Sequence, residues 1–405
     1  MTTSAIEPVQ RLVYLDWLRI FATLMLIPFH ALEAFGYRTF YNKAPDLGYA
    51  YEAAAQTIAL WHMPLLFLIA GAASYFTFKN KSHRQFLITR ARRLLVPFLF
   101  SVFTVLPITG YLSDNPRYGI NHQSFWDYYP RFFRFHWDGI GGFSGTFTPG
   151  HLWFLLYLFM FSIIGTYLLR AFESGRAKNS IDKFAEILNR FPLLIFLSAL
   201  PLSVTRATWP FYPYPAYYLC FFLFGYLLFA SKPLASTLRK SFWPAAVLVI
   251  VLTPILLQQY VRGSFDPTPN FTMFPFATIA ERVLVELTAI SWLILIYELA
   301  RLFVTRETPL IRYLSEASIA IYVIHLTIVV AFSRLFIGLG YSNIISLIFI
   351  VLSSVIATGI IYEIFIRRWN MVRILFGMKT RRQHDDTYLP KEHGSTEKVH
   401  DSLRG

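Results

Sequence analysis

The amino-acid sequence predicts an all-α polytopic membrane protein, a bundle of about ten transmembrane helices with both termini in the cytosol. The 405 residues are 55% hydrophobic and 15% charged, with a mean hydropathy of +0.47, which excludes an ordinary soluble protein. Apolar stretches of roughly 18–25 residues recur along the chain, and this is the length that a helix needs to cross a bilayer. Lysines and arginines gather in alternate loops, which indicates the sidedness of the helices.

Ten segments have the character of membrane spans. They cover residues 16–36, 54–78, 88–110, 151–170, 191–205, 214–231, 242–260, 282–304, 315–336 and 343–366. The fifth is short and flanked by prolines (FPLLIFLSALPLSV), so we expect it to tilt or to depart from a regular helix. The single cysteine of the chain excludes an intramolecular disulfide framework.

The distribution of positive charge predicts that both termini are cytosolic. Segments on one side of the membrane carry 27 lysines and arginines, whereas the loops on the other side carry seven. The formal net charge of +14 therefore reflects orientation, and we expect no nucleic-acid partner. Residues 1–376 are expected to form the membrane domain, and the polar residues 377–405 a disordered cytosolic tail. We expect an integral, multi-pass protein of the plasma (inner) membrane.

The first span carries two ionisable residues on one helical face. Arg19 and His30 are eleven positions apart, close to three turns, which separates them by about 16 Å along the axis. Ionisable groups at such depth are costly and usually face a protein interior or a wet cavity. Glu33 follows His30 at i+3, near enough to influence it. Asp16 stands three residues before Arg19, so Arg19 is either half of a structural ion pair or a ligand for an anion.

Two further histidines are expected near His30. His62 is predicted at a similar depth, and His151 on the same outer side of the membrane. His62, in LWHMPLLFLIAG, lies about 12 Å below the outer surface if the second span runs inward. The two spans are expected to be antiparallel neighbours, so the imidazoles of His30 and His62 are predicted to share one cavity. His151, in HLWFLL, opens the fourth span at the outer lip. A packing role in the helix bundle is the alternative for each histidine.

Three arginines, Arg90, Arg92 and Arg93, open the third span on the cytosolic side. Guanidinium groups pair with phosphate bidentately, so this cluster is a candidate site for a nucleotide diphosphate. The alternative is an ordinary accumulation of positive charge on the cytosolic side. His325, near the middle of the ninth span, has a packing and a catalytic interpretation, both open. Arg282 and Glu286 are predicted to form an i,i+4 pair.

The loop of residues 111–150 is the largest outer segment. It contains aromatic side chains and carboxylates of the kind that suit the faces and hydroxyls of sugars, namely Tyr118, Trp126, Tyr128, Tyr129, His136, Trp137, Asp127 and Asp138. An amphipathic segment at the membrane interface is the alternative. The sequence has no Walker loop, Rossmann fingerprint, HExxH or GxSxG motif. We therefore expect no permanently bound cofactor and no metal.

These residues resemble those of the integral-membrane acyltransferase family 3. Arg19 and His30 match an Arg/Lys-x10-His pattern in the first helix of that family, and Arg90 to Arg93 resemble its basic motif at helix three. The runs IPFH (27–30), HMPLLFLIAG (62–71) and HLWFLL (151–156) are most similar to the glucan biosynthesis protein C branch, whose members succinylate periplasmic glucans. The resemblance covers about residues 11–370 and marks 1–376 as an acyltransferase domain.

The resemblance implies transfer of an acyl group, acetyl or succinyl, from cytosolic acyl-CoA to a hydroxyl of an extracytoplasmic glycan. Arg90, Arg92 and Arg93 then hold the phosphates of the donor, with Arg19 deeper in, and the pantetheine arm reaches toward the middle of the bundle. His30 either deprotonates the acceptor hydroxyl or is acylated transiently. His62 and His151, with Glu33 beside His30, orient the acceptor or share the proton.

Two other function classes are open at this point. A proton-coupled transporter or flippase would use the histidines as a relay and predicts ionisable residues spread through several helices. The carboxylates within the spans lie mostly near helix ends, which favours the enzyme. A scaffold or sensor without catalysis leaves the pairing of His30 with His62 unexplained.

Overall fold

The fold is a helical membrane bundle. The computed structural model describes residues 12–79, 82–113, 124–135, 146–207, 213–261 and 276–381, and all regular structure in these ranges is helical. Seven helices there are long and apolar enough to cross a membrane by themselves, and three bent helix pairs raise the number to ten. The predicted all-helical membrane bundle is therefore confirmed.

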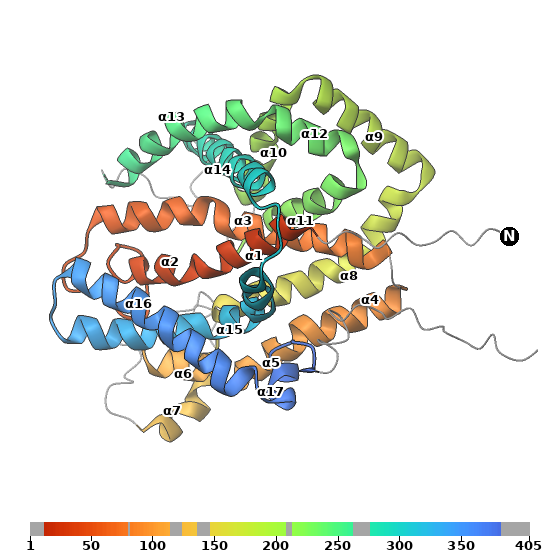
Figure 1. Ribbon diagram of the computed structural model, residues 1–405. Helices are drawn as coiled ribbons and strands as arrows, with labels where there is room; N and C mark the ends of the chain where they lie inside the picture. The colour runs from red at the N-terminus through yellow and green to blue at the C-terminus, as the bar shows by residue number, and fades with distance from the viewer. Residues whose placement is uncertain are drawn as a thin grey trace, which may run out of the picture.

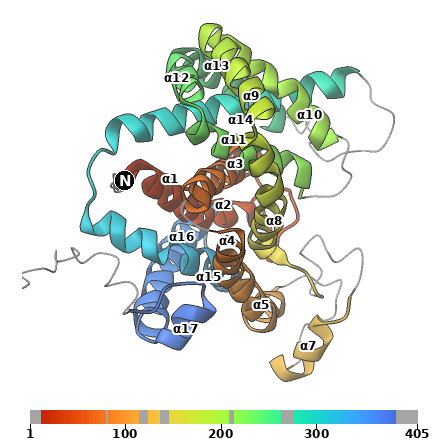
Figure 2. The ribbon, with the colours of Figure 1, turned by 90° about the vertical axis from the view of Figure 1, so that its right-hand side faces the viewer.

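The centre of the bundle is the long helix α3 (Tyr49–Lys79), with the two pieces of the first span packed beside it (Figures 1 and 2). These pieces are α1 (Val13–Leu24) and α2 (Leu26–Glu33), separated at Met25. The other unbroken spans surround them: α8 (Trp153–Glu173), α13 (Phe242–Val261), α14 (Phe276–Phe303), α15 (Pro309–Gly338) and α16 (Asn343–Ile361).

Three spans are bent. The first joins α4 (His83–Arg90), the π-helical turn η1 (Ala91–Leu95) and α5 (Val96–Phe103) to α6 (Val105–Tyr111) at 41°. The second joins α9 (Gly175–Arg190) to the 3-10 segment η5 (Pro192–Ser198) and α10 (Ala199–Ala207) at 114°, and the third joins α11 (Pro215–Ala230) to α12 (Lys232–Lys240) at 107°. Because η5 is a 3-10 segment, the expected irregularity of the fifth span is confirmed.

The bundle has two ends that differ in charge. One end, which we call the basic end, carries α4, α9 and α12 together with the short helix α17 (Asn370–Leu375) (Figure 1). The opposite end carries the C-terminus of α2, the turn between α15 and α16, and helix α7 (Phe125–Phe132). The expected tail is described as far as residue 381; Gly377 and Met378 are buried, and residues 382–405 lie outside the described part.

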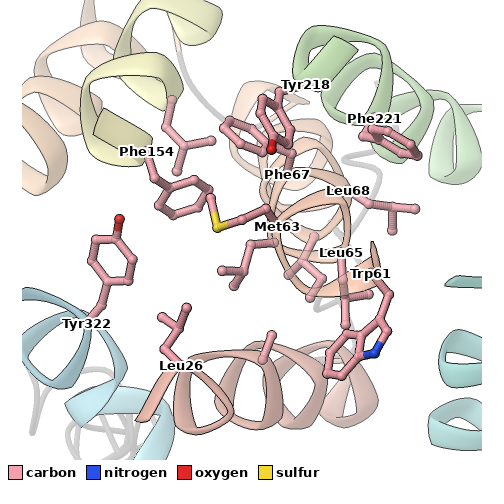
Figure 3. Packing of buried hydrophobic residues seen from close by; sticks show 14 of the residues in the cluster. Leu26, Trp61, Met63, Leu65, Phe67, Leu68, Phe154, Tyr218, Phe221 and Tyr322 are labelled. Atoms are coloured by element: carbon pink, nitrogen blue, oxygen red, sulfur yellow. The ribbon is translucent and has the colours of Figure 1, made fainter. Parts of the chain in front are cut away.

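Helices α3 and α11 cross at close range because glycines line both sides of the contact. A Cβ atom at Gly71 would lie 1.8 Å from the carbonyl oxygen of Phe222, and one at Gly225 would lie 1.9 Å from that of Leu68. Small residues let membrane helices approach in this way. Next to the crossing, the rings of Phe67 and Tyr218 stack at 4.8 Å, within the apolar core of Figure 3.

A buried ion pair joins α10, α11 and α14. The carboxylate of Glu286 is fully buried, accepts from the Arg206 guanidinium at 2.9 Å and accepts from the Tyr217 hydroxyl at 2.8 Å. The predicted i,i+4 pair of Arg282 with Glu286 is wrong, because Arg206 takes that carboxylate from a different helix. A buried charge needs its partner, so this network fixes the bent fifth span onto α14.

The close crossing predicts that Gly225→Ala destabilises the protein. The new methyl group has backbone rather than a flexible side chain against it, so the helices have to separate, at a cost of about 1–3 kcal/mol or more. Thermal unfolding of the purified protein in detergent measures this effect. The matched control is Gly359→Ala in α16, where a Cβ atom meets nothing within 4 Å; equal stability of the two variants would contradict the prediction.

Candidate active site

The imidazole of His30 is paired with a carboxylate of its own helix. His30 Nδ1 donates to Glu33 Oε2 at 2.7 Å, and both side chains are largely buried. The pairing follows from the i,i+3 spacing, which puts the two residues on one face of α2. The ammonium of Lys43 donates to the carbonyl oxygens of Glu33, Gly36 and Arg38. It thereby caps the helix end that holds the pair.

The second predicted histidine, His62, lies close to His30 through a shared aromatic neighbour. The ring of Phe29 is 4.8 Å from each of the two imidazoles, measured between ring centroids. His62 is buried, and its Nδ1 donates to the carbonyl oxygen of Ile58 at 3.0 Å. The structure thus brings the first and second spans together at the level of these histidines, as the sequence predicts.

His151 and His325 complete a cluster around His30. The ring of His325, on α15, is 5.4 Å from that of His30 and 5.1 Å from that of His151. His325 is fully buried. Tyr322, one turn earlier, donates its hydroxyl to the carbonyl of His151 and packs on Phe154 at 5.3 Å (Figure 3). The sequence marks His325 as unusual in an apolar span, but it does not say which helices are neighbours.

The hydrogen bonds of the four imidazoles define their tautomers. His151 Nε2 is 3.0 Å from the carbonyl oxygen of Val323, and His325 Nδ1 is 2.7 Å from that of Tyr322. A carbonyl oxygen only accepts, so each of these nitrogens carries the proton and the other nitrogen of the neutral ring has a lone pair. His62 likewise carries its proton on Nδ1, which faces the carbonyl oxygen of Ile58. The carboxylate of Glu33 holds the proton on Nδ1 of His30. Each ring is therefore set to accept a proton or a hydrogen bond at its second nitrogen.

Two of these second nitrogens are buried without a hydrogen-bond partner among the described residues. They are His151 Nδ1 and His325 Nε2. A buried acceptor without a donor is costly, so such atoms are usually met by water or by a ligand. Across the described part of the chain, no group of three or more histidine, cysteine, aspartate or glutamate side chains is arranged to hold a metal ion. The cluster is therefore suited to proton transfer and hydrogen bonding.

Arg19, the other residue singled out in the first span, is bound to residues of α1 and α15. Its guanidinium donates to Asp16 at 2.9 Å and to the backbone and side chain of Ser315 on α15. The Ser315 hydroxyl donates in turn to Asp16 at 2.9 Å. Of the two interpretations, the structural ion pair describes these contacts. The ion pair joins α1 to α15 about three helical turns before His30.

The three predicted arginines differ in their surroundings. Arg90 is partly buried, donates to the Ser74 hydroxyl of α3 at 2.7 Å and lies over the ring of Phe86 at 5.1 Å. Arg92 and Arg93 are exposed on the π-helical turn η1 at the basic end. Arg90 thus packs against α3, whereas Arg92 and Arg93 face solvent.

Helix α3 contacts Arg90 through Ser74 and itself carries His62. Ser74, which receives Arg90, and His62 are twelve residues apart on this one helix, which corresponds to roughly 18 Å. The two candidate half-sites therefore lie at different depths of the bundle, on either side of the α3–α11 crossing at Gly71. A ligand that touches both has to be long and narrow.

The outer aromatic segment is described in part. Tyr128 on α7 is buried, Trp126 is exposed, and the Tyr129 hydroxyl donates to the carbonyl of Phe103 at 2.9 Å. Tyr118, His136, Trp137 and Asp138 lie outside the described residues.

Comparison with known proteins adds a family match and distant relatives. The family model described as an acyltransferase domain matches residues 12–363. The chain is similar to glucans biosynthesis protein C of Escherichia coli O6:K15:H31 (strain 536 / UPEC), at 23% identity over 93% of this chain and 98% of the relative. It is also similar to glucans biosynthesis protein C of Salmonella agona (strain SL483), at 21% identity over 89% and 93% of the two chains. No solved structure matches the chain.

Proposed function

Because the chain belongs to the acyltransferase 3 family, we propose that this membrane acyltransferase moves an acyl group from cytosolic acyl-CoA to a hydroxyl of an extracytoplasmic glycan. The observation that carries the proposal is that α3 contacts both half-sites. Its Ser74 accepts from Arg90 next to the basic turn η1, and its His62 belongs to the histidine cluster deeper in the bundle. The names of the relatives, which refer to glucan biosynthesis, support a glucan as the acceptor. We propose acetyl or succinyl as the transferred group.

On the donor side, the exposed guanidinium groups of Arg92 and Arg93 bind the phosphates of acyl-CoA. Arginine suits this task because its planar fork donates two parallel hydrogen bonds to phosphate oxygens. The excess of lysine and arginine at this end supports a cytosolic orientation, where acyl-CoA is present. The pantetheine arm then follows α3 inward, over roughly the 18 Å that separates Ser74 from His62, and carries the thioester to the cluster.

At the cluster, His30 is the general base. Its Nδ1–H is held by Glu33, so Nε2 takes the proton from the acceptor hydroxyl as the oxygen attacks the thioester carbonyl. The new C–O bond forms, the C–S bond breaks, and the CoA thiolate receives the proton that His30 holds. The charge of Glu33 stabilises the imidazolium between these two steps.

The other histidines bind and orient the acceptor. The lone pairs of His151 Nδ1 and His325 Nε2 have no donor among the described residues, and a hydroxyl or a water molecule supplies one. His62, buried against Phe29, forms the opposite wall. In this arrangement His325 belongs to the site together with His30, His62, His151 and Glu33.

The proposal predicts that His30→Ala loses most of the transfer activity. Removing a general base typically costs about 10²–10⁴-fold in kcat, and the KM for acyl-CoA should change little because the donor is held at the other end. The assay uses purified protein, radiolabelled acyl-CoA and a glucan acceptor. His83→Ala at the start of α4 is the control, since His83 packs on Phe78 and is remote from the cluster. A His30→Ala variant with wild-type kcat would overturn the assignment.

Loss of a phosphate ligand should act on the donor alone. Arg93→Met is expected to raise the KM for acyl-CoA by about 10–100-fold, the worth of a charged hydrogen bond, with the KM for the glucan unchanged. Arg84→Met, which removes one equally exposed positive charge from α4, controls for the general electrostatic attraction. The same increase in both variants would show that Arg93 acts only through net charge.

A further inference from the structure

The exposed arginine pair lies on a turn that its own helix supports poorly. In η1 the amide of Val96 donates to the carbonyl of Ala91, five residues back, instead of four. Pro97 follows, and proline has no amide hydrogen to donate to the carbonyl of Arg93. The backbone beneath Arg92 and Arg93 thus departs from regular α-helical hydrogen bonding, as π-turns at functional sites often do.

A hook at the C-terminal end of the membrane domain supports this turn. The hook comprises α17 and residues 376–379, and it turns through a Schellman motif in which Met378 N donates to Arg373 O at 2.8 Å and Gly377 N to Ile374 O at 2.9 Å. Gly377, at φ +69°, forms its apex. A Cβ atom there would lie 2.5 Å from the carbonyl oxygen of Arg93.

Both the conformation and the contact therefore require glycine at position 377. The left-handed backbone disfavours other residues, and the close approach to Arg93 leaves no room for a side chain. The contact is made to the backbone of Arg93, so it fixes the position of the turn, while both arginines are exposed to solvent.

The hook is in turn anchored to the rest of the bundle. The buried guanidinium of Arg373 pairs with Glu316 of α15 at 2.5 Å and donates to the carbonyl of Lys379 at 2.7 Å. The ring of Phe376 packs edge-on against Phe100 of α5 at 5.6 Å. Glu316 is nine residues from His325 on the same helix, so α15 connects the hook to the histidine cluster over roughly 13 Å.

We propose that this hook positions the Arg92–Arg93 turn for the phosphates of acyl-CoA, with Gly377 as the positioning residue. The inference rests on the proposed function for its ligand. Through Glu316, the hook also joins the turn to α15, the helix that carries His325. A firmly held turn also binds phosphate without first having to be ordered.

The test compares two glycines that share a backbone conformation and differ in contact. Gly377→Ala introduces both the left-handed strain and the collision with Arg93. Gly340→Ala, at φ +74° with nothing within 4 Å of its Cβ position, introduces the strain alone. We expect Gly377→Ala to raise the KM for acyl-CoA about tenfold with kcat within about twofold, whereas Gly340→Ala leaves both unchanged.

Hydrogen–deuterium exchange of residues 91–97 is the second measurement, and it needs no acyl-CoA. Gly377→Ala should speed exchange there about tenfold relative to Gly340→Ala. Phe376→Leu, which keeps the glycine and loses the ring contact with Phe100, should shift both quantities in the same direction by a smaller factor. If Gly377→Ala matches Gly340→Ala in either measurement, the positioning role is refuted. If the wild-type protein uses no acyl-CoA, the proposed function fails, and exchange alone decides whether the hook supports the turn.

Discussion

The active-site chemistry depends on one constraint, which is that an imidazole in an apolar bundle has to give its N–H to an oxygen of the protein. All four clustered histidines satisfy it, three with backbone carbonyls and His30 with the carboxylate of Glu33. Since a neutral imidazole has one proton, this use of the N–H leaves a lone pair at the other nitrogen of every ring. Only His30 has an ionisable acceptor, and a carboxylate stabilises an imidazolium better than a carbonyl does. The same constraint therefore distinguishes His30, the proposed base, from the three histidines around it.

The rest of the bundle holds the arginines at the basic end and the histidine cluster at a fixed separation. Helix α3 holds Ser74, which binds Arg90, and His62, which faces the cluster. Helix α15 holds Glu316, which binds the hook, and His325. The close crossing at Gly71 and Gly225 holds α11 against α3. The Arg206–Glu286 pair holds α10 against α14. The proposed transfer between two depths requires such continuous elements, because the proposed donor and acceptor sites have to stay at a fixed separation.

Local spacing predicted the parts of the site that lie on one helix. The number and type of spans, the pairing of His30 with Glu33 and the irregular fifth span all follow from hydropathy, i,i+3 geometry and proline chemistry. Contacts between helices were less predictable. The expected local pair of Arg282 with Glu286 does not form, because Arg206 from another helix binds Glu286. The packing of Arg90 against α3 likewise could not be predicted from its spacing to Arg92 and Arg93. The place of His325 beside His30 depends on which helices are neighbours, and no periodicity within one span contains that information.

The central claim is that one bundle carries an acyl group between its two ends. The most direct test uses the wild-type protein in sealed proteoliposomes, oriented so that the basic end faces outward, with radiolabelled acyl-CoA outside and a glucan acceptor trapped inside. The account predicts that label accumulates on the trapped glucan, and that glucan added only outside stays unlabelled. Labelling of glucan only when it shares a compartment with acyl-CoA would contradict transfer across the membrane.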